Sequence, residues 1–113
     1  MNITERAQKV LTEIDAALAL AEKTTPGPWQ QDLSLVITTY SNPEICDCDG
    51  YSIKQDEDNA AFIAASRTGY PMSLRCLKTA IGGLLRYDDC GSETWLWAQQ
   101  TLTILCDQWE NNL

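Results

Sequence analysis

The chain has 113 residues, of which 16 are acidic and 8 are basic, giving a net charge of −8 at neutral pH. A chain of this length is expected to fold as a single domain, residues 1–113, which buries very roughly two thirds of the surface that the unfolded chain exposes. Nucleic-acid binding depends on Lys and Arg that neutralise phosphates, so the excess of acidic residues argues against direct nucleic-acid binding.

The sequence contains no histidine and five cysteines. The commonest general base, the commonest metal ligand and the Ser–His and Cys–His nucleophiles are therefore all missing. An odd number of cysteines, no basic segment followed by an apolar one at the amino terminus, and no apolar run of membrane-spanning length predict a cytoplasmic protein with reduced thiols. We therefore predict a protein that is not an enzyme and needs no cofactor.

Residues 3–23 are predicted to form a long first helix. Asn2 followed by Glu5 resembles a capping box, in which both side chains satisfy backbone N–H groups of the first turn. Apolar residues then recur at spacings of three and four on one face: Ile3, Ala7, Val10, Leu11, Ile14, Leu18 and Ala21. The stretch TTPGPW, residues 24–29, ends the helix, because the residue before a proline disfavours the α region. Trp29 is expected to fold back onto that apolar face.

Residues 29–53 have the pattern of strands, with LVITTY rich in β-branched and aromatic residues. Turn signals at 41–43 and at 49–50 predict a small antiparallel sheet of two or three strands. A second helix is predicted over NAAFIAASR, capped by Asp56 or Asp58 and ending near Gly69. Pro71 suits the first turn of a third helix that extends to about residue 87.

The inner stripe of the third helix is expected to consist of Met72, Leu74, Leu77, Ile81 and Leu84. Its Gly82-Gly83 pair predicts a kink or the close approach of another backbone. Ser92 is expected to cap a fourth helix, whose core residues are Trp95, Ala98, Leu102, Leu105 and Trp109. The fold class is thus α+β: a long amino-terminal helix, a small antiparallel sheet of two or three strands, and three further helices.

Two stretches together resemble a known family: TTPGPW after an amphipathic helix, and DNAAFIAASRTGYP about thirty residues later. The combination is similar to the small early or accessory proteins of tailed bacteriophages and prophages, including the Ead type, over roughly residues 4–85. The resemblance implies a phage or prophage origin and a helix–sheet–helix arrangement, and it brings no catalytic residues. The matching positions are explained as turn chemistry, capping and packing: residues 25–29, residues 59–65, Arg67 and Pro71.

Acidic residues are concentrated in the first half of the chain. Residues 1–58 carry eleven acidic and four basic residues, a charge of −7, against −1 for the remainder. This asymmetry favours a basic protein partner, with Glu44, Asp47 and Asp49 as predicted contacts. On the fourth helix, Trp97 and Ile104 lie on a second apolar face, which predicts a further protein-binding surface and a homo-oligomer.

Two other patterns compete with this interpretation. Arg75, Lys78 and Arg86 share one helix face with Gly82, and Arg67 from the preceding helix is a candidate fourth member. Such a basic stripe is typical of phosphate or nucleotide binding, although an ordinary solvated face explains it better. Cys46-Asp47-Cys48 lacks the spacing of a thiolate metal site and has no second pair, so packing is favoured and no metal is predicted.

The preferred function is therefore that of a non-enzymatic phage or prophage accessory protein in the cytoplasm of a bacterial host. It is expected to bind a host or phage protein, for example to counteract a host defence. The alternative is a small-ligand module that sequesters a nucleotide or another phosphate-bearing anion on the basic helix face.

Overall fold

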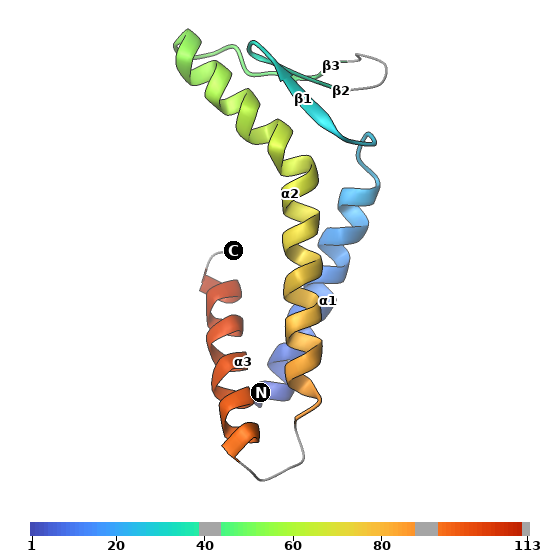
Figure 1. Cartoon of the computed structure of the whole chain (residues 1–113), viewed down its shortest axis with the longest axis vertical. Helices are drawn as coiled ribbons and strands as arrows, with labels where there is room; N and C mark the ends of the chain where they lie inside the picture. Colours follow the sequence, from blue (N-terminus) through green and yellow to red (C-terminus); the bar gives the residue numbers. More distant parts are fainter. Residues whose placement is uncertain (39–43, 88–92, 112–113) are drawn as a thin grey trace. The chain divides into compact units, whose positions relative to one another are not determined.

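A computed structural model describes residues 1–38, 44–87 and 93–111, in which three helices and one three-stranded sheet are found (Figure 1). In chain order they are α1 (Ile3–Glu22), β1 (Trp29–Asp32), β2 (Leu35–Thr38), β3 (Glu44–Asp47), α2 (Ile53–Leu85) and α3 (Glu93–Asn111). The α+β class and the antiparallel sheet are confirmed, whereas the prediction of four helices is wrong.

Contacts between residues divide the chain into two compact units. Unit 1 comprises residues 1–17 and 74–113, and unit 2 comprises residues 18–73. The helices α1 and α2 each contribute residues to both units. Each unit has its own buried residues, and each is described separately below.

The first helix begins where the capping pattern predicts. The Oδ1 atom of Asn2 accepts a hydrogen bond from the backbone N–H of Glu5 at 2.8 Å, which satisfies one of the unpaired donors of the first turn. The Glu5 carboxylate, however, accepts a bond from the Asn2 side-chain amide at 3.5 Å instead of one from a backbone N–H. At the other end α1 stops at Glu22, two residues before TTPGPW.

The helix predicted over NAAFIAASR and the helix predicted from Pro71 to about residue 87 form one helix of 33 residues, α2. Ser52 caps it: its hydroxyl accepts a bond from the Gln55 N–H at 3.2 Å, and Asp56 instead accepts the backbone N–H of Tyr51 at 2.8 Å. Gly69 and Pro71 lie inside the helix at a typical cost of about 1 and 3 kcal/mol. Burial of Pro71 itself, and of helix residues before and after it, offsets that cost.

Unit 1 is built from three helical segments around a small apolar core. The buried residues are Ala7, Val10 and Ile14 of α1, Leu74 and Ile81 of α2, and Ala98, Leu102 and Cys106 of α3. The prediction that Met72 belongs to the inner stripe of the predicted third helix is wrong, because its side chain is 56% exposed and it lies in unit 2.

Polar bonds surround this core. Arg6 binds Asp107 at 2.7 Å and Glu110 at 2.9 Å, and these carboxylates raise the pKa of Arg6 above its ordinary value. The indole N–H of Trp109 donates to the Glu13 carboxylate at 2.6 Å. These bonds join α1 and α3 within unit 1.

The sheet of unit 2 has the order β1-β2-β3, with both pairs antiparallel. A two-residue turn, Leu33-Ser34, joins β1 and β2, and Leu33 has a φ of 57°. Val36 of β2 is fully buried against Ala60 and Ala64 of α2, with Trp29, Ile45, Cys46, Cys48 and Ile63 packed around them. The turn predicted at 41–43 and the Ser92 cap lie outside the described residues.

The two stretches that carry the family resemblance contact each other in unit 2. The Arg67 Nε–H donates to the carbonyl of Thr25 at 3.2 Å, and the guanidinium lies 6.0 Å from the centre of the Trp29 ring. The indole N–H of Trp29 donates to the same carbonyl at 3.0 Å. Trp29 therefore packs against the core cluster of β2 and α2, and its contact with the apolar face of α1 stays a prediction.

Gly27 makes this arrangement possible. A Cβ atom built at residue 27 would lie 2.8 Å from Cγ of Arg67, closer than real side chains approach. The glycine of TTPGPW is thus required by the arginine of NAAFIAASR. We call this set of contacts, formed by Thr25, Gly27, Trp29 and Arg67, the arginine clamp.

Candidate functional site

A groove of about 420 Å³ opens in unit 2 where β3 ends and α2 begins. Its lining residues are Asp47, Cys48, Asp49, Gly50, Tyr51, Asn59, Phe62 and Ile63. Carboxylates and exposed aromatic rings thus line one hollow, which we call the acidic aromatic groove.

Phe62 faces this groove because of its position on α2. Ala60 and Ala64, two residues before and after it, point into the core, and two helical residues correspond to a rotation of about 200°. The Phe62 side chain therefore points away from the core and is 74% exposed. The interpretation of residues 59–65 as packing and capping is wrong at this position.

The carboxylate of Asp47 is held by two hydrogen bonds. Its Oδ1 atom accepts the Ser34 hydroxyl at 3.2 Å and the backbone N–H of Asp49 at 3.0 Å. These bonds fix the chain segment that carries both Asp47 and Asp49 at the edge of the groove. The bond from the Tyr51 N–H to the buried Asp56 fixes the loop that carries the Tyr51 ring.

Basic residues do not neutralise the groove within the described ranges. Lys54 pairs with Asp58 at 2.6 Å, and no ion pair joins Asp47 or Asp49 to a described basic residue. Unit 2 as a whole contains eight acidic and three basic residues, a net charge of −5. Of these three basic residues, Arg67 is engaged in the arginine clamp.

The structure brings two of the three predicted acidic contacts together. Asp47 and Asp49 line the groove, whereas Glu44 lies at the other end of β3, opposite Ile37, and does not line it. Sequence reasoning missed Tyr51 and Phe62, which are 80% and 74% exposed. The offset of two residues between Phe62 and each core alanine separates the ring from the core, but only the structure shows that the alanines face inward.

The two cysteines of β3 and its end pack against the core cluster of Val36, Ala60 and Ala64. Burial is the main reason why the pKa of the Cys46 thiol is raised, and the neighbouring Cys48 raises it further. A raised pKa disfavours the thiolate form that metals bind. Among the residues that the structure describes, no group of three or more Cys, Asp or Glu side chains is placed to hold one metal ion.

The predicted basic stripe is divided. Lys78 pairs with Asp15 at 2.6 Å in unit 1, and Arg67 belongs to the arginine clamp of unit 2. Arg75 is exposed, and Arg86 lines a separate groove that contains Trp97. Nucleotide binding by these residues stays a prediction. A Cβ at Gly82 or Gly83 would meet open space, so the predicted close approach of another backbone is wrong.

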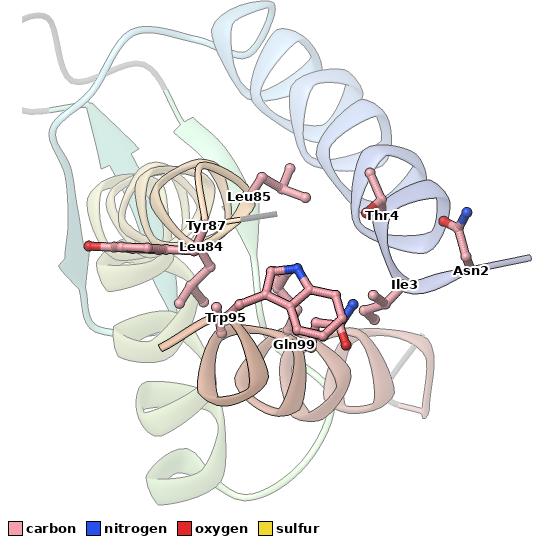
Figure 2. A pocket seen from close by; sticks show the side chains of 10 residues that line it. Asn2, Ile3, Thr4, Leu84, Leu85, Tyr87, Trp95 and Gln99 are labelled. Atoms are coloured by element: carbon pink, nitrogen blue, oxygen red, sulfur yellow. The ribbon is translucent and has the colours of Figure 1, made fainter. Parts of the chain in front are cut away.

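Unit 1 contains two hollows beside α3. A pocket of about 230 Å³ lies between the ends of its helices, where Figure 2 shows Trp95 and Gln99 facing Ile3. Its lining also includes Asn2, Thr4, Leu84, Leu85, Tyr87, Ala98 and Leu102. The second hollow, of about 620 Å³, is lined in part by Trp97, which is 57% exposed. Ile104, seven residues further on the same face of α3, is 60% exposed.

Comparison of the chain with models of protein families, with curated proteins and with solved structures finds no match. The resemblance to phage accessory proteins therefore stays a prediction, based on the two stretches that meet in the arginine clamp. None of the described helices combines the length and the apolar character needed to cross a membrane.

Proposed function

We propose that this chain is a non-enzymatic accessory protein of a phage or prophage, which binds a host or phage protein in the cytoplasm of a bacterial host. Counteracting a host defence is the role that such a protein would serve. The acidic aromatic groove of unit 2 is its working surface. The observation that carries the proposal is the exposed Phe62 on a helix whose opposite face forms the core.

Physical reasoning supports this choice of surface. When a partner covers an exposed aromatic ring, apolar surface is removed from water, which favours binding. Aromatic residues are accordingly enriched at the centres of protein interfaces. Carboxylates around such a ring increase the association rate with a basic partner and disfavour acidic ones. Asp47 and Asp49 thus supply selectivity, while Phe62 and Tyr51 supply apolar contact area.

We also propose that the chain forms a homo-oligomer through the face of α3 that carries Trp97 and Ile104. Both side chains are more than half exposed and lie two turns apart on one helix. Replacing Trp97 by Glu should lower the mass measured by light scattering without changing the circular dichroism spectrum.

The main proposal is tested by capture from a host lysate with the purified protein and two variants. Phe62→Ser removes the ring from the groove, whereas Leu20→Ser removes a side chain on α1 that is 66% exposed and does not line it. A specific partner should be captured by the natural protein and by Leu20→Ser, and lost with Phe62→Ser. Equal capture by all three proteins would show that the groove is not the working surface.

A further inference from the structure

We infer that the acidic aromatic groove receives an arginine side chain of the partner, presented by a short segment with apolar neighbours. This inference rests on the proposed function, because it names the chemistry of the partner at the same surface. The groove, at about 420 Å³, lies near the lower end of the range of about 300–1,000 Å³ for ligand sites. It therefore suits one or two side chains rather than a whole helix.

Guanidinium matches both kinds of group that line the groove. It is planar and weakly hydrated, stacks on aromatic faces, and donates paired hydrogen bonds to carboxylates. Phe62 and Tyr51 offer ring surfaces, and Asp47 and Asp49 offer carboxylates on the same hollow. A lysine ammonium is more strongly hydrated and presents no planar face, so arginine is the better occupant.

The backbone that carries the groove residues is held before a partner binds. The Asp47 carboxylate is held by Ser34 and by the Asp49 N–H, the backbone of Tyr51 is held by Asp56, and Phe62 lies on a helix. Binding then requires little ordering of the backbone, which favours affinity from a small contact.

The same chemistry already occurs within unit 2. In the arginine clamp, Arg67 lies 6.0 Å from the centre of the Trp29 ring while its Nε–H donates to the Thr25 oxygen. The groove offers an aromatic surface and oxygen acceptors but contains no arginine of its own among the described residues. An arginine from outside would complete a second arrangement of this kind.

Phe62 makes the inference directly testable, because it is the only phenylalanine in the chain. Protein labelled with 4-fluorophenylalanine gives one ¹⁹F resonance, which reports on the groove alone. The probes are two peptides, N-acetyl-Gly-Leu-Arg-Leu-Gly-amide and the same peptide with citrulline, the neutral analogue of arginine. Each is added into the millimolar range at low and at physiological salt.

The arginine peptide should shift the resonance in a saturable manner, and its affinity should exceed that of the citrulline peptide about tenfold or more, as expected for charge-assisted hydrogen bonds. In the Asp47→Asn, Asp49→Asn variant this preference should disappear. The amide introduced at residue 47 keeps an oxygen acceptor for the Ser34 hydroxyl and for the backbone N–H of residue 49, so the fold is expected to persist. The control variant Asp32→Asn, which removes a carboxylate outside the groove, should keep the preference.

Two results would overturn the inference: no shift with either peptide, or equal shifts with both. The outcome is distinguishable from failure of the proposed function. If Phe62→Ser abolishes capture of the partner but arginine is not preferred over citrulline, the groove still binds a protein and only the arginine is wrong. If capture does not depend on Phe62, the proposed function fails whatever the peptides do.

Discussion

Replacing Gly27 by Ala should destabilise unit 2 through the arginine clamp. The new Cβ would lie 2.8 Å from Cγ of Arg67, which is too close, and Cγ is near the root of the side chain, so the whole arginine must move. Movement of Arg67 weakens its bond to the Thr25 carbonyl and its contact with the Trp29 ring. The φ angle is not the obstacle, because Gly27 lies outside the left-handed region that favours glycine.

The magnitude follows from three contributions. A hydrogen bond from a charged group typically contributes about 1.5–3 kcal/mol, and a partly exposed cation–π contact about 0.5–1 kcal/mol. Against this loss, a Gly→Ala change reduces the entropy of the unfolded chain and stabilises by about 0.4–1 kcal/mol. The net expectation is a loss of about 1–3 kcal/mol in the free energy of unfolding.

Chemical denaturation of four proteins measures the effect: the natural chain, Gly27→Ala, Arg67→Ala and the double variant. The cost of Gly27→Ala should largely vanish when Arg67 has been removed, because the side chain that it strikes is gone. Gly69→Ala serves as the control, since a Cβ at residue 69 meets open space inside α2. That variant should be more stable than the natural chain by about 1 kcal/mol.

The reasoning would be refuted if Gly27→Ala were as stable as the natural protein. It would also be refuted if its cost were the same with and without Arg67. Unchanged stability would mean that residue 27 does not require a glycine. A cost that is independent of Arg67 would mean that the turn itself requires the glycine, and in both cases the two family-like stretches would not be coupled through residue 27.

Further expectations concern other parts of the chain. Gly82→Ala and Gly83→Ala should each raise the free energy of unfolding by about 1 kcal/mol, because both residues are helical and have open space around them. Leu33→Asn should stabilise the hairpin, most clearly in thermal melting, since a leucine at a φ of 57° is strained by about 1–2 kcal/mol and asparagine tolerates that conformation. The exposed Cys76 should be alkylated at neutral pH well before Cys106, whose burial hides the thiol and raises its pKa, as peptide mass spectrometry can check; comparable rates in the folded protein would contradict the packing of α3.

Local signals predict much of the fold. The start of α1 follows from Asn2 and Glu5, and the strands follow from β-branched residues between turn signals. The continuity of α2 could not be predicted in this way, because Gly69 and Pro71 are locally unfavourable in a helix. Whether such residues end a helix depends on how much apolar surface is buried on both sides, which is a property of the tertiary structure.

The candidate site is predictable in part, from charge. The charge pattern of the sequence selects Glu44, Asp47 and Asp49, and two of these three residues line the groove. Phe62 and Tyr51 cannot be identified from charge, because an apolar residue in a helical or strand-like stretch is normally assigned to the core. Only the packing of Ala60 and Ala64 against Val36 fixes which side of α2 faces inward, and that contact joins residues far apart in sequence.

The edges of the sheet have a consequence for how the protein behaves in solution. Within the described residues β1 and β3 are the outer strands, each is four residues long, and Asp32, Glu44 and Asp47 lie at their ends. Unpaired backbone groups on an outer strand can recruit a strand from another molecule, and short length together with like charge opposes this. Acidification toward the isoelectric point of about 4.2 removes that repulsion. Edge-to-edge aggregation should therefore begin in mildly acidic buffers, and added salt should promote it at neutral pH.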